Sequence, residues 1–314
     1  MKSMFKGLWA GSALLFSFNL HGAIDIIFDY SYDTGNYFSD DRRYIMDQVA
    51  YVFESRMGGE SFAAYRPVQD FGLNSTTAYL NFTSPSSSST LNPTIGSTTS
   101  EGNVIGKANE LIIFLGAKSI AGTTLASAGQ TGYGYSTTDN ITSWQNALAA
   151  KDSTTNFEPI AGSSQVNTNK TFYYDTDLTT HNDALSSGKT DFYSVMVHEI
   201  GHVMGFANST NLTRNLAWKA NISGSLWTGT NAKAEYNDEN VPLYSTAHWD
   251  KTTTSGSGAL DTSKINCDCH PSMLPSISIN KRTSFSALDF ALLKDIGYNI
   301  SASPVGTNIG GTFT

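Results

Sequence analysis

The chain of 314 residues is poor in cysteine and in positive charge. Its two cysteines, Cys267 and Cys269, are one residue apart, so a disulfide between them would close a very small, strained ring. A fold held together by a framework of disulfides is therefore excluded. Lys and Arg number 19 against 27 Asp and Glu, which gives a formal net charge of −8. Such an acidic chain is a poor partner for nucleic acid and for anionic membrane surfaces.

Long apolar runs are also scarce once the first residues are set aside. Residues 1–23 have the pattern of a secretory signal peptide, with Lys2 and Lys6 before an apolar run at 7–20 and a small residue, Ala23, at the expected cleavage point. No later segment is apolar for long enough to cross a bilayer. We therefore expect an exported protein, extracellular or periplasmic, with no stable membrane association after the signal is removed.

One stretch carries a metal-binding pattern: residues 191–206 read DFYSVMVHEIGHVMGF. Within it, His198, Glu199 and His202 form an H-E-x-x-H motif. Residues four apart lie on one face of a helix, so both imidazoles can reach the same ion. Neutral imidazole suits Zn²⁺ in a tetrahedral site that leaves one position for water. Glu199 is then the general base for the metal-activated water that attacks a carbonyl, which indicates a zinc peptidase.

Apolar residues in the same stretch recur at helical spacing and predict a buried back face. They are Phe192, Met196, Ile200 and Val203. Thr190 or Asp191 is the expected N-cap, and Gly205 is expected to end the helix because glycine tolerates positive φ.

The rest of the chain predicts a mixture of strands and helices. Strands are expected at 24–32, 78–82, 110–117 and 171–177, and helices at 39–57, 143–150 and 286–298. Ser286 and Asp289 resemble a capping box at the start of the last helix. Residues 83–102 and 207–241 are polar and predict surface loops. The Gly- and Ser-rich run that ends at Gly134 suits an irregular edge where an extended partner could pair by backbone hydrogen bonds.

A catalytic zinc usually takes three protein ligands, and the residues alone leave the third open. Three positions past Gly205, where an extended motif can place a third histidine, the chain has Asn208, whose neutral amide is a poor zinc ligand. The other candidates are His181, which precedes the helix, and His248, Asp250 and His270, which follow it.

The order of motifs over residues 191–298 resembles the metzincin metallopeptidases, most closely their leishmanolysin-like branch. That branch has H-E-x-x-H-x-x-G-F, an insertion, a distant third histidine, a methionine turn and a closing helix. The matching pieces here are Gly205-Phe206, His248-Trp249, Met273-Leu274-Pro275-Ser276 and Lys294-Asp295-Ile296-Gly297-Tyr298. The resemblance implies that His248 is the third ligand and that Met273 lies beneath the metal. Asn208 departs from the simple metzincin pattern.

The resemblance also implies an α+β fold of two lobes, at about 24–206 and 207–300, followed by a flexible tail at 301–314. The first lobe would hold a twisted mixed sheet and two long helices, with the cleft beneath the strand at 110–117, and the second would be irregular with a closing helix. The implied function is that of a secreted, monomeric zinc endopeptidase acting on peptides or proteins. The alternatives are a binding module on a degenerate peptidase scaffold and a zinc hydrolase of non-peptide amides or esters.

Two further groups are weaker metal candidates. Asp175 and Asp177 could bind calcium, although a solvated turn is the commoner role of such a pair. Cys267, Cys269 and His270 offer three ligands close in sequence, but a complete tetrahedral site needs a fourth.

Overall fold

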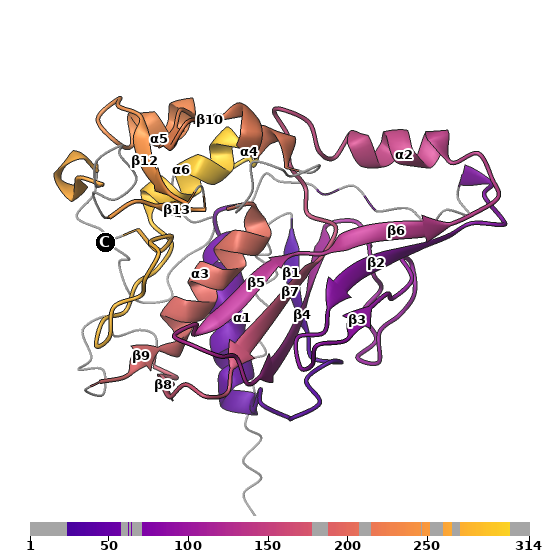
Figure 1. Ribbon diagram of the computed structural model, residues 1–314, viewed down its shortest axis with the longest axis horizontal. Coiled ribbons are helices and arrows are strands. Elements are labelled where there is room, and N and C mark those ends of the chain that lie inside the picture. Colours follow the sequence, from indigo (N-terminus) through magenta and orange to yellow (C-terminus); the bar gives the residue numbers. More distant parts are fainter. Residues whose placement is uncertain are drawn as a thin grey trace, which may run out of the picture.

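The computed structural model describes residues 24–57, 62, 64, 71–177, 188–206, 215–245, 247–251, 260–265 and 271–301. Over these residues helices and several sheets are mixed, which confirms the expected α+β class (Figure 1). Among the described helices, none has the length and apolar character needed to span a membrane.

The principal sheet has the strand order β1-β4-β7-β5. Its strands are β1 (Asp25–Asp29), β4 (Glu110–Lys118), β7 (Gly162–Asn167) and β5 (Ala126–Gln130). The first three are parallel, and β5 runs antiparallel to β7 at the edge. The apolar run of β4 is buried on both faces, as expected for a central strand. The Gly- and Ser-rich run therefore does form an edge, but β5 is a regular strand within it.

Two helices cover one face of this sheet, α1 (Asp40–Glu54) and α3 (Phe192–Met204). The helix α1 packs on β1, α3 packs on β5 and β7, and the two helices contact each other (Figure 1). Alternation along β4 separates two cores, because Leu111, Ile113 and Leu115 join the helices while Ile112 and Phe114 face the other side.

A second layer covers the opposite face of the sheet. It consists of β2 (Thr77–Thr83), β3 (Thr90–Leu91), β6 (Gly132–Ser136) and α2 (Thr142–Ala149). The expectation that residues 83–102 contribute nothing to a core is wrong, because β3 pairs with β2 and Ile95 is buried in this layer. Two isolated apolar residues, Leu91 and Ile95, in a Ser/Thr-rich stretch have no periodicity that would reveal their packing.

The C-terminal part is built from short elements. They are α4 (Leu216–Ala220), β10 (Ile222–Ser223), β11 (Leu226–Trp227), α5 (Thr230–Ala234), β12 (Val241–Tyr244), β13 (His248–Trp249), a 3-10 helix (Thr262–Lys264) and α6 (Ala287–Asp295). The interpretation of 207–241 as loop is thus wrong for its described residues. Trp218 and Trp227 are fully buried there, with ring centroids 4.7 Å apart. The strand expected at 171–177 is limited to β8 (Phe172–Tyr173), which pairs with β9 (Thr190–Asp191).

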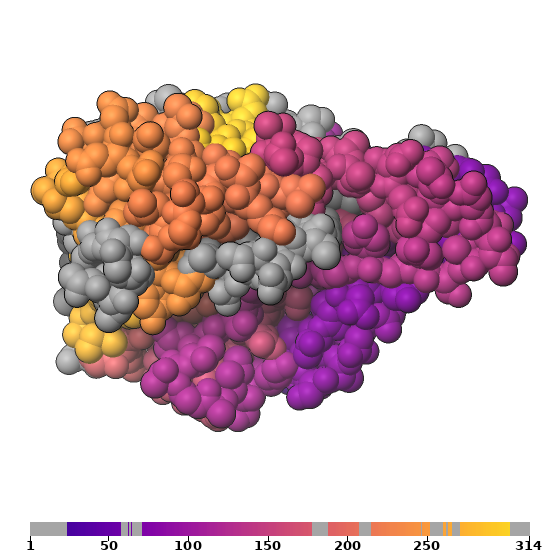
Figure 2. Space-filling model, turned by 45° about the horizontal axis from the view of Figure 1, so that its top comes forward, coloured from indigo at the N-terminus to yellow at the C-terminus, as the bar shows by residue number. Residues whose placement is uncertain are grey.

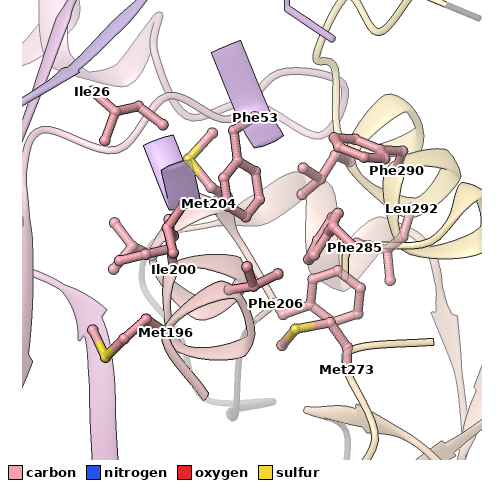
Figure 3. Close-up of a cluster of buried hydrophobic side chains, with 14 of the residues drawn as sticks. Ile26, Phe53, Met196, Ile200, Met204, Phe206, Met273, Phe285, Phe290 and Leu292 are labelled. Atoms are coloured by element: carbon pink, nitrogen blue, oxygen red, sulfur yellow. The ribbon is translucent and has the colours of Figure 1, made fainter. Parts of the chain in front are cut away.

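One hydrophobic core runs through both expected lobes. It joins α1 and α3 to α6 and the chain before it, and the rings of Phe53 and Phe285 lie 4.8 Å apart (Figure 3). Figure 2 shows the orange C-terminal elements gathered beside the magenta and violet strands and helices of the N-terminal part. This shared core fixes α6 and the segment before it against α3, the helix that contains the motif.

Candidate metal centre

The helix α3 has the capping residues expected from the sequence. The carboxylate of Asp191 accepts a hydrogen bond from Ser194 N (3.1 Å), which caps the N-terminus. Gly205 ends the helix with φ of +130°, and a Cβ at this position would lie 2.5 Å from Ile296 Cδ1. The helix is buried almost all round rather than on one face, because the C-terminal part covers the side that the sheet does not.

The structure brings three histidines together. His198 Nε2 lies 3.2 Å from His202 Nε2 and 3.3 Å from His248 Nε2. Zn–N bonds of about 2.0–2.1 Å in a tetrahedral site place ligand nitrogens about 3.3 Å apart, so the spacing fits one ion. His248 reaches this position on the hairpin of β12 and β13, in which it lies opposite Tyr244.

Backbone carbonyls orient both motif histidines. His198 Nδ1 donates a hydrogen bond to the carbonyl of Ser272 (2.8 Å), and His202 Nδ1 donates one to the carbonyl of Phe206 (2.8 Å). A carbonyl can only accept, so each Nδ1 carries the hydrogen and each Nε2 presents a lone pair. Both imidazoles are therefore in the tautomer that binds a cation through Nε2.

The three histidines are held in the neutral form. Burial lowers the pKa of His198 well below its usual value, and the neighbouring His202 and His248 add to this effect. Burial also lowers the pKa of His202, and it lowers the pKa of His248 to about 3, with His202 contributing. Neutral imidazole is the form that binds a metal, so the site is ready for a cation near pH 7.

Glu199 is buried between α3 and the edge strand. Its carboxylate accepts a hydrogen bond from the backbone N–H of Ala128 in β5, and burial raises its pKa to about 8. A carboxyl with this pKa can accept and release a proton near neutral pH. The site thus offers three neutral nitrogen ligands and, next in sequence to the first, a proton-transfer group.

Asp289, at the start of α6, holds His248 and the turn at Ser272 together. It is fully buried and accepts hydrogen bonds from Trp249 Nε1 (2.7 Å), Ser272 N (2.8 Å) and both the N–H and the hydroxyl of Ser286 (2.8 Å each). Trp249 N also donates to the carbonyl of Met273 (2.8 Å). The strand with the third histidine and the carbonyl that orients the first are therefore joined through one carboxylate.

Met273 is fully buried under α3 (Figure 3). A Cβ added to Gly201, between the two motif histidines, would lie only 2.5 Å from Met273 Sδ. Gly201 therefore permits the close approach of the turn to the helix, and a larger residue there would displace it. The sulfur of Met273 thus lies against α3 at Gly201.

Among the described residues, the remaining sequence candidate for the third ligand is Asp250. His181, Asn208, Cys267, Cys269 and His270 lie outside the described residues. Asp250 is fully buried but does not belong to the group of three histidines. Among the described His, Cys, Asp and Glu side chains, that group is the only one of three or more members whose ligand atoms are close enough to share an ion.

The contacts of Asp175 give no support to the calcium site expected at Asp175 and Asp177. One carboxylate oxygen of Asp175 forms a buried ion pair with Arg282 (2.7 Å), and the other accepts a hydrogen bond from Asp177 N (2.9 Å). Both oxygens that calcium would need already have partners within the protein.

Sequence reasoning missed the groups that orient the cluster, above all Ala128 N–H, the carbonyls of Ser272 and Phe206, and the role of Asp289. Only Asp289 had a signal, as the capping-box residue of α6, and that signal concerned the helix alone. Comparisons with models of known families and with curated proteins found no match for this chain.

Proposed function

We propose that this protein is a secreted, zinc-dependent endopeptidase of the metzincin type, with motifs in the order of the leishmanolysin-like branch. His198, His202 and His248 would hold Zn²⁺, and Glu199 would act as the general base. The observation that supports this most is the meeting of three neutral Nε2 atoms at the spacing of tetrahedral ligands, beside a buried carboxylate. Three imidazoles with one open position are a common ligand set for catalytic zinc.

The residues of the chain divide the chemistry between them. His198, His202 and His248 would hold a Zn²⁺ ion, which would supply polarisation of the scissile carbonyl and a lower pKa, towards about 7, for the attacking water. Glu199 accepts the proton of the attacking water and delivers it to the leaving amine. The hydrogen bond from Ala128 orients the carboxylate, and burial keeps it basic enough for this transfer. Ser272 and Phe206 keep the motif imidazoles in place through their carbonyls.

The position of β5 favours a peptide as substrate. Within the described part of the chain β5 pairs only with β7, so its other edge offers backbone groups to an extended segment. The same strand bonds Glu199 through Ala128, so a peptide paired there would lie beside the general base. This edge favours peptide hydrolysis over the hydrolysis of small esters or amides, which need no strand pairing.

Removal of the third ligand tests the metal site. We expect the purified protein to hold about one zinc per chain and to cleave casein, with the cleavage lost on chelation and restored by zinc. His248→Ala should lose most of its zinc and all detectable cleavage, whereas His270→Ala should keep both. Retention of zinc by His248→Ala together with its loss from His270→Ala would overturn the ligand assignment.

Substrate panels separate the proposed activity from its alternatives. The zinc-loaded protein should cleave peptides much faster than matched small esters and non-peptide amides. Zinc-loaded protein that binds peptides without cleaving any of them would instead identify a binding module, and preferential ester hydrolysis would identify the other class of hydrolase.

A further inference from the structure

A cavity of about 240 Å³ is linked to the cluster of three histidines through Ser272, although none of the three lines it. Ser272 lines this cavity, while its carbonyl accepts the hydrogen bond from His198. A cavity needs only about 10–15 Å³ to hold one water, so this one can admit an amino-acid side chain. Its walls include Leu260, Leu274 and Ile277, which provide apolar surface.

The charged groups that line the cavity are both positive. They are Lys251 and Lys281, which are exposed, and neither forms an ion pair with a carboxylate of another described residue. No described carboxylate lines the cavity: Asp191 pairs with the buried Arg282, Asp289 accepts a hydrogen bond from Ser272 N, and Asp250, next to Lys251, is fully buried. As far as the described residues go, the cavity therefore presents positive charge to whatever enters it.

A buried hydroxyl in the same wall lacks a partner. Ser272 is only 4% exposed, and its Oγ makes no hydrogen bond with any described residue. By contrast, the hydroxyl of Ser194, also in the wall, donates to Asp191 (2.7 Å) and accepts from Thr283 N (2.7 Å). Because the Oγ of Ser272 has almost no accessible surface, it is closed to a ligand in the cavity, so the two lysines and the apolar wall are what a ligand would meet.

We propose that this cavity receives an acidic side chain of the peptide substrate, from a residue that flanks the cleaved bond. Lys251 and Lys281 attract the carboxylate, and the methylene groups lie against the apolar wall. The inference rests on the proposed peptidase function and adds a substrate class to it: peptides with Asp or Glu next to the scissile bond.

The charge pattern determines which side chains are disfavoured. A Lys or Arg side chain in the cavity would face two like charges, and Gln would match the size of Glu without balancing the charge of the lysines. Because both lysines are partly in water, we expect a moderate preference, about tenfold in kcat/KM for Glu over Gln, that weakens as salt is raised.

The test uses the zinc-loaded protein and a mixture of peptides with amidated C-termini, so that side chains supply the only carboxylates. Cleavage sites mapped by mass spectrometry should be enriched in Asp and Glu at one of the two positions that flank the cleaved bond. Matched peptides with Glu, Gln or Lys at that position then give kcat/KM for each. We expect the order Glu, Gln, Lys.

Charge reversal locates the effect in the cavity. Lys281→Glu should remove the preference for Glu or shift it to Lys, and Lys281→Met should reduce it. Lys294→Glu, at an exposed position on α6 outside the cavity, makes the same change in net charge and should keep the preference.

The outcomes separate this inference from the proposed function. Peptide cleavage with no acidic preference at either flanking position, or a preference that survives Lys281→Glu, would overturn the assignment of the cavity and leave the peptidase in place. If the zinc-loaded protein cleaves no peptide, the proposed function fails and the assignment fails with it.

Discussion

Two carboxylates are buried near the candidate metal centre, and their surroundings differ. Glu199 lies between α3 and the edge strand, where it accepts a hydrogen bond from Ala128 N–H. Asp289 lies at the start of α6, where Trp249, Ser272 and Ser286 all donate to it. Burial raises the pKa of both, that of Glu199 to about 8. Their difference is therefore in hydrogen bonding, not in burial.

This difference separates a reactive carboxylate from a structural one. A carboxylate has about four lone-pair positions, and the donors around Asp289 occupy most of them. Such a group joins the segments that donate to it and has little capacity left to take a proton from a substrate. Glu199 keeps acceptor capacity in a buried site, which is what a general base needs.

The largest expected effect comes from Glu199→Gln. Gln keeps the size of the side chain and the hydrogen bond from Ala128, but it cannot take a proton. We expect the zinc-loaded variant to lose about 10²- to 10⁴-fold in kcat/KM for peptides, because general-base catalysis contributes that much. Its zinc content should equal that of the wild type. A variant that keeps a tenth or more of the activity would remove Glu199 from the role of base.

Asp289→Asn should affect folding and metal binding instead. The amide would direct its NH₂ group at one of the donors, so we expect unfolding free energy to fall by about 3–5 kcal/mol, as for other broken buried charge contacts. The Ser272 carbonyl and the His248 strand would lose their common anchor, and zinc affinity should fall about 10- to 100-fold. Denaturant unfolding and competition with a zinc chelator measure the two effects.

Asp295→Asn is the matched control for that variant. Asp295 also accepts an indole hydrogen bond, from Trp227 Nε1 (2.9 Å), and also binds the N-terminus of a helix, through Asn231 N (2.7 Å). In the described part of the chain its carboxylate bonds Trp227, Asn231 and Ala232, and neither the three histidines nor the turn at Ser272 is among its partners. This control should lose stability but keep its zinc affinity. If both variants lose zinc affinity equally, the loss reflects general destabilisation and Asp289 has no special role in the site.

Elements with local signals were predictable from the sequence. The helix α3 was expected with Asp191 and Gly205 at its ends, α6 with the capping box of Ser286 and Asp289, and β4 from its apolar run. Each of these signals depends on residues within one or two turns of a helix or on one strand, so no tertiary information was needed.

The groups that complete the site could not be predicted in this way. The proximity of His248 to the motif depends on how residues 215–249 fold, and their short elements and buried tryptophans have no clear periodicity. Ala128, Ser272 and Phe206 act through backbone atoms, which every residue type has, so their identity carries no signal. The motif order implied His248 only through its resemblance to a family.

The smallest expected effect compares the stabilities of Glu199→Gln and the wild type without metal. The carboxyl of Glu199 has a pKa of about 8 when folded and an ordinary value of 4.5 when unfolded. Below about pH 4.5 it is protonated in both states and has no effect on unfolding.

As pH rises from 4.5 towards 8, the unfolded state releases the proton while the folded state keeps it, so the wild type loses stability. Gln has no such proton, and the neighbouring histidines are the same in both proteins. The unfolding free energy of Glu199→Gln, relative to that of the wild type, should therefore increase between pH 5 and pH 8 by on the order of a few kcal/mol. Urea unfolding of the chelated proteins at the two pH values measures this gain. A difference that stays constant with pH would show that the carboxylate is as well solvated in the folded protein as in the unfolded chain, and the contrast with Asp289 would then be lost.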